Sequence, residues 1–361
     1  MTLSHHSLLA LCLLCYSSLL PADFASEVDA LFRPYDNPQV PGAAVLVLHN
    51  GQLLYQKAYG LAELETDRAV KESTNFRMAS VSKQFTALST LVLVDKKLLD
   101  LDETLQDVFP DFAAYGREIT IRHLLHHISG IRDYEELLPG SGQVNDSDVV
   151  AILKRQNSTY FTPGSQYRYS NSGYCVLSQI VQVRAGIPYA QFVEENLFRP
   201  LGMFTSHVYE RDSPPPIPQR AFGYTRYGST FKKTDQSQTS ATQGDGGIYT
   251  SVSEYARWAR GLNFLVSPEL AELLFTPGVL NNGSTISYGM GWSLGSAHGR
   301  KRYSHTGSTI GFRTAVELYP ESDTAIAVFI NRAASAPWDI ASEIASKLFQ
   351  QKILVIPVNS R

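Results

Sequence analysis

Short runs of apolar residues near both ends of the chain have the length and composition of β-strands. The predicted strands are residues 43–49, 52–59, 312–319 and 324–330. Between the first two, Asn50 and Gly51 tolerate the positive φ of a tight hairpin turn. Residues 337–350 carry the three and four spacing of an amphipathic helix. Both ends of the chain therefore predict an antiparallel sheet with an adjoining helix.

The middle of the chain changes to a helical pattern of apolar positions. The predicted helices are residues 81–98, 119–127, 172–185 and 189–197. Ser251 and Glu254 have the spacing of a capping box, which predicts a further helix through Leu262. Residues 213–243 contain four prolines and a tract rich in Ser, Thr and Gln, which predicts a surface excursion.

This arrangement predicts an α+β fold in which an antiparallel sheet from both chain ends is flanked by helices and interrupted by an inserted domain. We expect residues 26–100 and 285–361 to form the sheet-containing domain. Residues 101–284 would form the inserted, mostly helical domain, with the active site between the two.

The first 25 residues have the pattern of a secretory signal peptide. The apolar run of residues 8–20 is shorter than the roughly 20 residues that a membrane-spanning helix needs. Small residues suited to cleavage follow at Ala22 and Ala25. No other stretch approaches membrane-spanning length, so we expect a secreted or periplasmic protein without a transmembrane anchor in its mature chain.

The chain has three cysteines, and two of them lie in the predicted leader. Lipid anchoring at Cys12 or Cys15 is disfavoured because Leu11 and Leu14 precede them where a small residue is expected. Cys175 is then the only cysteine of the mature chain, which excludes an intramolecular disulfide. Its apolar neighbours predict a buried, inert thiol.

Composition and charge narrow the function. Of 361 residues, 43% are hydrophobic and 18% charged, which is typical of a globular protein. Lys and Arg number 31 against 34 Asp and Glu, a net charge of −3, so no basic surplus exists to neutralise phosphates. We expect a small-molecule or peptide substrate rather than nucleic acid; the sequence does not set an oligomeric state.

Ser80 and Lys83 lie three residues apart at the start of the predicted helix 81–98, which places hydroxyl and ammonium one turn apart on one face. A serine beside a lysine can be activated as a nucleophile, and a helix N-terminus favours the developing alkoxide. The spacing alone is weak, because Ser229 and Lys232 repeat it in a stretch without a helical pattern.

Tyr169 and Asn171 follow a turn and supply a phenol that can relay a proton and an amide that can donate and accept hydrogen bonds. Tyr35 and Asn37 have the same spacing, so this pair is also weak by itself. Its structural alternative is a packed tyrosine followed by an asparagine that caps a helix.

His305, Thr306, Gly307 and Ser308 precede the predicted strand 312–319. Gly307 would let a substrate backbone approach, and the amide of Ser308 could point at an oxyanion. A plain β-turn is the alternative. Together the three motifs form a strong signal, because they occur in the order nucleophile, tyrosine and strand motif that this chemistry uses.

Two rival kinds of site are less favoured. The histidines His123, His126 and His127 lack the accompanying acidic residue of a zinc-binding helix, so packing and capping roles are expected for them. An α/β-hydrolase elbow would need Gly-x-Ser-x-Gly, which does not occur. We therefore expect no metal and no organic cofactor.

With these motifs the sequence resembles the serine hydrolases grouped with class C beta-lactamases, penicillin-binding DD-peptidases and related esterases and aminopeptidases. The resemblance spans nearly the whole mature chain. The further segments that carry it are residues 121–130 (IRHLLHHISG), 161–164 (FTPG), 196–203 (NLFRPLGM), 246–249 (GGIY), 288–292 (YGMGW) and 305–311 (HTGSTIG). It implies a beta-lactamase/transpeptidase-like fold with an active site between a sheet domain and a helical domain.

The resemblance implies an acyl-enzyme mechanism with Ser80 as nucleophile and Lys83 and Tyr169 as the proton-transfer pair. Amides of Ser80 and Ser308 would form the oxyanion hole. On the substrate, Asn171 would hold the acyl-side amide. The remaining predicted substrate-binding residues are His305, Thr306 and Gly307.

One departure from the lactamase pattern concerns His305, which stands where lactamases have the lysine of Lys-Thr-Gly. An imidazole with a reference pKa near 6.5 binds carboxylates more weakly near neutral pH than an ammonium does, unless Arg313 substitutes. The expected substrates are small D-amino-acid peptides or esters. Two alternatives stay open: a beta-lactamase or DD-carboxypeptidase, and a non-catalytic protein that binds peptidoglycan fragments or acts as a scaffold.

Overall fold

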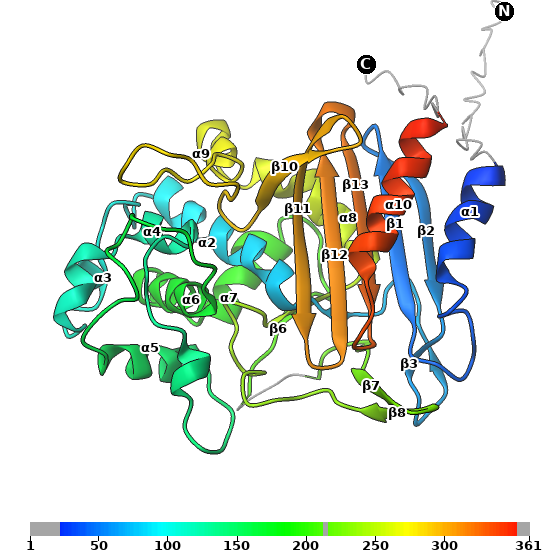
Figure 1. Ribbon diagram of the computed structural model, residues 1–361, viewed down its shortest axis with the longest axis horizontal. Coiled ribbons are helices and arrows are strands. Elements are labelled where there is room, and N and C mark those ends of the chain that lie inside the picture. The colour runs from blue at the N-terminus through cyan, green and yellow to red at the C-terminus, as the bar shows by residue number, and fades with distance from the viewer. Residues whose placement is uncertain (1–21, 212–215, 352–361) are drawn as a thin grey trace, which may run out of the picture.

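A six-stranded antiparallel sheet joins the two ends of the chain in the computed structural model, which describes residues 22–211 and 216–351 (Figure 1). Its strand order is β10-β11-β12-β13-β1-β2. The strands are β1 (Ala43–His49), β2 (Gln52–Tyr59), β10 (Ser293–Ala297), β11 (Arg300–Thr309), β12 (Phe312–Tyr319) and β13 (Thr324–Ile330). The prediction of an α+β fold with a sheet from both chain ends is confirmed.

Helices cover both faces of the sheet, and further helices lie on the side of its β10 edge (Figure 1). They are α1 (Ala22–Phe32), α2 (Lys83–Asp95), α3 (Leu105–Val108), α4 (Ile121–Leu125), α5 (Asp146–Lys154), α6 (Asn171–Ala185), α7 (Tyr189–Val193), α8 (Val252–Gly261), α9 (Pro268–Leu273) and α10 (Pro337–Gln350). Three smaller antiparallel sheets lie outside the large one. They are β3 (Leu61–Glu63) with β4 (Arg68–Ala69); β9 (Ile248–Thr250) between β5 (Phe76–Arg77) and β6 (His207–Val208); and β7 (Tyr224–Tyr227) with β8 (Thr230–Lys233).

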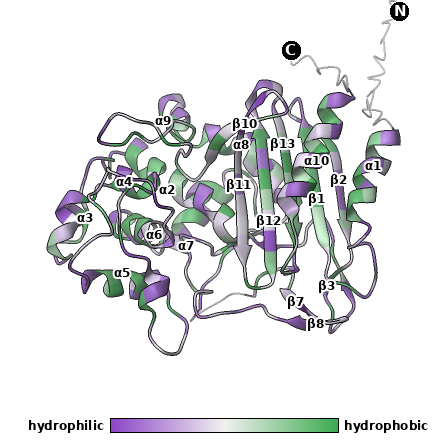
Figure 2. Ribbon diagram, viewed as in Figure 1, coloured by the Kyte–Doolittle hydropathy of each residue, from purple (hydrophilic) through white to green (hydrophobic). Residues whose placement is uncertain are grey.

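Both faces of the large sheet are buried, which explains the continuous apolar runs of its central strands. In β1, Val45 and Val47 belong to the core under α1 and α10, whereas Leu46 and Leu48 belong to the opposite core, which includes α8. Figure 2 shows the same strands in the green of hydrophobic residues. The β1–β2 turn follows the prediction, with φ of 49° at Asn50 and 70° at Gly51.

Strands β10 and β11 were not predicted, because polar and charged side chains break up any apolar run along them. β11 contains Arg300, Lys301 and Arg302, and most of its residues keep some solvent exposure. The residues from His305 to Ser308 therefore lie within a strand, which excludes the alternative of a plain β-turn.

The start of α2 and the capping of α8 differ from the sequence prediction. Ser80 lies in a 3₁₀ turn, Ala79–Ser82, and α2 begins at Lys83. At α8, Ser251 caps the helix by accepting from the Glu254 amide at 3.2 Å, but the Glu254 carboxylate accepts from the Thr205 amide at 2.9 Å. Only half of the predicted capping box forms, because tertiary contacts engage the glutamate.

The predicted domain boundaries stay a prediction, although the packing of α8 bears on them. This helix falls within residues 101–284, yet it packs against β1 and β13 of the large sheet. The remaining helices of that range, α3 to α7 and α9, lie on the side of the β10 edge of the sheet (Figure 1).

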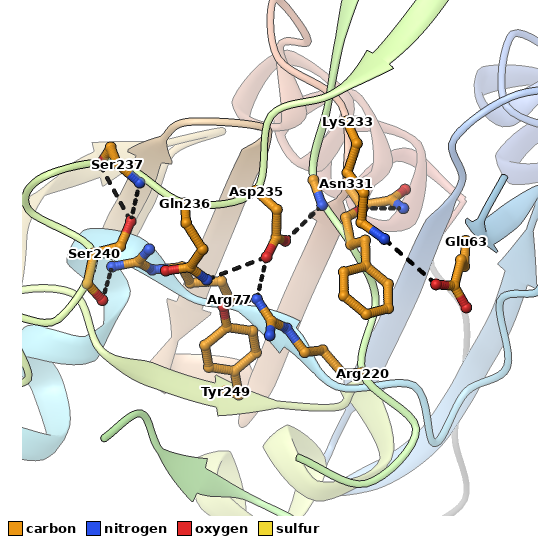
Figure 3. Close-up of polar contacts among 12 residues, drawn as sticks. Glu63, Arg77, Arg220, Lys233, Asp235, Gln236, Ser237, Ser240, Tyr249 and Asn331 are labelled. Carbon is orange, nitrogen blue, oxygen red and sulfur yellow. Dashed lines mark hydrogen bonds and ion pairs between the residues drawn. The ribbon is translucent and has the colours of Figure 1, made fainter. Parts of the chain in front are cut away.

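The predicted surface excursion contains the hairpin β7–β8, which polar contacts attach to the body of the protein (Figure 3). The Asp235 carboxylate pairs with Arg220 and accepts from the Gly223 amide at 2.9 Å. Asn331, which follows β13, donates to the Phe222 carbonyl at 2.8 Å. The segment is also anchored by the buried side chains of Ala221 and Tyr224, and the Phe222 amide donates to the Ala62 carbonyl at 2.8 Å.

The predicted leader overlaps α1, while residues 1–21 lie outside the described residues. Phe24 is fully buried and packs edge-on against Tyr55 with ring centroids 6.5 Å apart. Cleavage at Ala25 would remove this core side chain, so the structure disfavours a leader that extends through residue 25. Among residues 22–211 and 216–351, no helix combines the length and hydropathy needed to cross a bilayer.

Candidate active site

The turn that carries Ser80 is held in an unusual backbone conformation beside strand β11. Ala79 has a φ of +48°, a region that costs a residue with a side chain about 1–2 kcal/mol. The Thr314 hydroxyl donates to the Met78 carbonyl at 2.9 Å, which ties the turn to β12. Strain of this kind persists where the surroundings fix it, as they do at functional turns.

Gly307 allows β11 to approach this turn. A Cβ built there would lie 2.2 Å from the Met78 carbonyl oxygen and 2.2 Å from Thr314 Oγ1. From the sequence we expected the missing side chain to admit a substrate backbone. In the structure, the turn that carries Ser80 occupies the space where a Gly307 side chain would lie.

Lys83 is fully buried and donates three hydrogen bonds from its ammonium. The acceptors are Asn171 Oδ1 at 2.8 Å, the Asp245 carbonyl at 2.9 Å and, at a longer 3.4 Å, Ser80 Oγ. The predicted pair Ser80 and Lys83 is thus brought together, and Asn171 joins it.

Tyr169 stands beside this group, with its ring centroid 4.9 Å from Lys83 Nζ. The helix that follows is capped by Ser170, which accepts from the Gly173 amide at 3.2 Å. Asn171 is therefore free of the capping role that the structural alternative gave it. Within the described part of the chain, no hydrogen bond holds the Tyr169 hydroxyl, and the side chain is 36% exposed. This leaves the phenol open to exchange a proton with a bound substrate.

Glu135 is an acidic group beside Asn171 that no motif in the sequence indicates. The Asn171 amide donates to Glu135 Oε1 at 2.6 Å. Although part of the residue stays exposed, desolvation raises the pKa of its carboxyl, helped by the nearby charges of Asp245 and Asp133. Only the tertiary fold brings Glu135 to Asn171, so no spacing along the chain could have indicated it.

Two cavities meet at Ser80. One, of about 80 Å³, contains Asn171, Glu135 and Asp245 on its wall, together with Arg77. The other, of about 320 Å³, is lined by Tyr167, Tyr169, Tyr288, Ser293, His305 and Thr306. Ser308 borders both cavities. A third cavity, of about 520 Å³ beside Arg68 and Arg220, is not lined by any of these groups.

His305 is buried and neutral at physiological pH. Its Nδ1 lies 2.8 Å from the Thr306 carbonyl and its Nε2 lies 3.0 Å from the Tyr288 hydroxyl. A carbonyl only accepts, so Nδ1 carries the proton and Nε2 accepts from the tyrosine. Burial and the positive charge of Lys83 lower the pKa of His305 to about 4.

Arg313 does not supply the missing cation to the 320 Å³ cavity. Its Nη1 donates to the Thr309 and Phe312 carbonyls at 2.6 and 2.7 Å, and the residue is absent from the cavity wall. Thr306 and Ser308 are exposed neighbours on β11 and line the cavity as predicted.

Comparison with known proteins places this site in a family. Residues 28–346 match the beta-lactamase family. Penicillin-binding protein 4* of Bacillus subtilis (strain 168) is 31% identical over 333 residues, which cover 87% of this chain and 73% of that protein. The chain belongs to the beta-lactamase family.

Two further proteins are similar to this beta-lactamase-family chain, one in sequence and one in fold. The D-aminopeptidase of Brucella anthropi is 28% identical over 300 residues, covering 80% of this chain and 56% of that protein. The D-amino acid amidase from Ochrobactrum anthropi SV3, complexed with L-phenylalanine amide, has the same fold, with a TM-score of 0.78 at 20% identity over 92% of this chain and 100% of that chain. This beta-lactamase-family chain is a hydrolase that acts on amide or ester bonds.

Among the described residues of this beta-lactamase-family chain, one cluster of side chains has the atoms that could bind a metal ion. Asp146, Cys175 and Asp245 place one such atom each within 4.8 Å of one another, and all three are buried. Burial and the charge of Asp245 raise the pKa of Asp146 to about 7, so a proton on this carboxyl accounts for the cluster without a metal. Cys175 is buried as predicted, and burial raises the pKa of its thiol.

The three neighbouring histidines of the beta-lactamase-family segment 121–130 do not converge. His123 Nδ1 accepts from the Thr120 amide at 3.2 Å and so caps α4, as the sequence predicted. His126 and His127 are buried. Capping accounts for His123 and packing for His126, whereas His127 contacts the segment that carries Tyr169.

Proposed function

We propose that this hydrolase works through an acyl-enzyme formed on Ser80, with small D-amino-acid amides, peptides or esters as substrates. The observation that carries the proposal is the contact of the Lys83 ammonium with both Ser80 Oγ and Asn171 Oδ1 in a site open to two cavities. This arrangement joins a nucleophile, a proton-transfer group and a substrate-binding amide.

In this reaction Ser80 Oγ attacks the substrate carbonyl carbon, and its proton passes to the Lys83 and Tyr169 pair. The carbonyl oxygen becomes an oxyanion held by the amides of Ser80 and Ser308. Tyr169 then returns a proton to the departing amine or alcohol. Water completes the cycle by attacking the acyl group, which restores the Ser80 hydroxyl and releases the acid.

The two cavities support a division of the substrate between them. Because Asn171 lines the 80 Å³ cavity, we expect this cavity to hold the acyl part of the substrate. Its wall carries the carboxylates of Glu135 and Asp245 and the guanidinium of Arg77. A free α-ammonium on the acyl part would offset this negative charge. The 320 Å³ cavity would take the leaving group, and its wall of tyrosines and a neutral histidine suits an uncharged amide or ester rather than a terminal carboxylate.

The names of the relatives agree with an amine on the acyl side, since a D-aminopeptidase and a D-amino acid amidase are among them. The lack of a cation on the leaving-group side argues against the alternatives of a DD-carboxypeptidase or a beta-lactamase. A non-catalytic binder would not require the Lys83 contacts to the serine and the amide.

We also propose that the protein acts outside the cytoplasm, secreted or periplasmic, after cleavage of its leader. The apolar run of residues 8–20 supports this location. Intact-mass measurement of the exported protein tests it. A chain that begins near residue 22 agrees with the burial of Phe24, and an uncleaved chain contradicts the proposal.

The substrate proposal is tested with a matched panel: a D-amino-acid p-nitroanilide, its N-acetyl derivative, its L-enantiomer, a D-Ala-D-Ala peptide and a penicillin. Mass spectrometry after phosphonate treatment should find the adduct on Ser80. The free D-amine should be hydrolysed with the highest kcat/KM. Equal turnover of the N-acetyl compound would contradict the amine preference, and absence of both turnover and adduct would contradict the enzyme.

Glu135→Gln separates recognition of the amine from chemistry. Loss of one carboxylate should raise KM for the free amine about tenfold and leave the N-acetyl compound unchanged, because an exchange of about 1.4 kcal/mol corresponds to a factor of ten. Glu136→Gln is the matched control, since Glu136 contacts Tyr160 and Arg168 on the outer side of the same turn.

A further inference from the structure

His127 occupies a helix end where the backbone favours glycine. It follows α4 with a φ of +59°. The His127 amide donates to the Leu124 carbonyl at 3.2 Å and the Ile128 amide to the His123 carbonyl at 2.9 Å, which is the bonding of a Schellman motif. Glycine is usual at this position because a Cβ is strained there. The helix end alone therefore does not explain why a histidine occupies this position.

The side chain and carbonyl of His127 hold the segment around Tyr169 from both sides. The His127 carbonyl accepts from the Arg168 amide at 2.9 Å, and Nδ1 accepts from the Ser170 amide at 3.0 Å. Between these two bonds, the Tyr169 ring lies against the imidazole with centroids 4.3 Å apart and planes 37° apart. Three contacts from one residue thus fix the residue before Tyr169, the residue after it and its ring.

The hydrogen bond to Ser170 defines the protonation of the imidazole. A backbone amide only donates, so Nδ1 bears no proton and the neutral ring carries its proton on Nε2. Nε2 is buried without a hydrogen-bond partner among the described residues, and the ring is surrounded by Tyr169, Tyr174 and Tyr288. Burial and the charge of Lys83 lower the pKa of His127, which keeps the Nδ1 acceptor available.

We propose that His127 is a positioning residue that holds Tyr169 at the distance from Ser80 and Lys83 that proton transfer requires. The inference rests on the proposed role of Tyr169 in acylation and adds to it the residue that sets its place. The strained backbone of His127 at the end of α4 is tolerated because its imidazole supplies a hydrogen-bond acceptor to Ser170 and an aromatic surface to Tyr169. Proton transfer depends steeply on geometry, so a loosened Tyr169 would slow acylation without weakening substrate binding.

Three variants test this role. His127→Asn retains an acceptor close to the Nδ1 position and tolerates positive φ. His127→Phe retains an aromatic ring and removes the acceptor. His123→Phe is the matched control, because it also removes an Nδ1 that accepts a backbone amide on the same helix, here from Thr120.

The measurement is the rate of acylation per titrated active site in rapid-mix experiments, with KM and Tm for each variant. We expect His127→Phe to lower the acylation rate about 10- to 100-fold with KM within about twofold, and His127→Asn to recover most of the rate. His123→Phe should lower Tm and leave the rate per active site unchanged. Rate losses that follow Tm equally in all three variants would show a merely structural role and overturn the proposal.

Two further outcomes separate this inference from the proposed function. If Ser80→Ala abolishes turnover while His127→Phe acylates at the wild-type rate, the positioning role is wrong and the proposed function stands. If Ser80→Ala retains turnover, the proposed function itself is wrong. Should His127→Phe fail to fold, His127→Gly replaces it, because glycine suits the helix end and removes ring and acceptor together; a wild-type acylation rate in that variant overturns the proposal.

Discussion

The Lys83 ammonium donates its shortest hydrogen bond, 2.8 Å, to Asn171 Oδ1, while Ser80 Oγ lies farther away at 3.4 Å. The same Asn171 amide is expected to bind the acyl part of the substrate. A substrate that engages Asn171 would therefore compete with the lysine for one side chain. Binding and activation of the serine are coupled through this amide.

Ser80→Ala should abolish turnover and phosphonate labelling and leave the fold intact. Within the described residues, the Ser80 hydroxyl makes only the long contact to Lys83, so its loss should change the free energy of unfolding by about 1 kcal/mol at most. Ser229→Ala is the control, since Ser229 precedes β8 and shares only the spacing. Wild-type kcat in Ser80→Ala, or loss of activity in Ser229→Ala, would refute the nucleophile assignment.

Lys83→Ala and Tyr169→Phe should each lower the acylation rate about 100-fold or more, because each removes one half of a proton-transfer unit. The double variant should lose little more than the worse single variant, since groups that act together are not additive. Stopped-flow acylation of the four proteins gives the coupling. Fully additive losses would show two independent roles.

His305 should respond to pH only in strong acid. Because its pKa is about 4, the ring stays neutral between pH 6 and 8, and kcat/KM for a carboxylate-bearing substrate should not gain from His305 in that range. The expectation from the sequence placed this gain nearer pH 6.5. His305→Lys should raise the ratio of kcat/KM for a carboxylate substrate to that for a neutral ester about tenfold at pH 7, which corresponds to about 1.4 kcal/mol. An unchanged ratio would place the carboxylate elsewhere.

Asp146 should make the fold less stable as the pH rises through neutrality. The unfolded chain releases this proton near pH 4, whereas the folded chain keeps it until about pH 7, so the free energy of unfolding falls between these values. Asp146→Asn mimics the protonated group and should remove this loss, about 2 to 4 kcal/mol at pH 8. Urea unfolding from pH 4 to 8 measures the difference.

The control for this prediction is Asp111→Asn, which removes an exposed carboxylate paired with Lys154. Its slope of stability against pH between 4 and 7 should equal that of the wild type. A parallel slope in Asp146→Asn would mean that Asp146 does not hold the proton.

The parts of the fold that the sequence predicted are those in which local pattern and tertiary burial agree. β1, β2, β12, β13 and α10 have the predicted bounds. β1 and β13 are apolar runs buried on both faces, α10 has a clean amphipathic repeat, and the turn at Asn50 and Gly51 fixes the start of β2. β11 escaped prediction because its neighbours in the sheet, not its own side chains, make it a strand.

The residues of the candidate site also fall into those that the local sequence pattern predicts and those that only the tertiary fold reveals. Ser80 and Lys83 could be found from spacing, since one helical turn brings them together. Glu135, Tyr288 and His127 approach the site from separate segments, and only their contacts in the folded chain show what they do. The close approach at Gly307 likewise depends on where Met78 lies in the fold.

The pairing of β1 with β13 determines when, during synthesis of the chain, the active site can form. Ala43 pairs with Ile330, so this ladder joins strands from the two ends of the described chain. Closing so long a loop is slow. The turn that carries Ser80 contacts β11 and β12, so it can reach its final position only after both strands have been synthesised. A nascent chain that ends before β12 would already carry Ser80, Lys83 and Tyr169 and would still lack the strand whose Thr314 holds this turn.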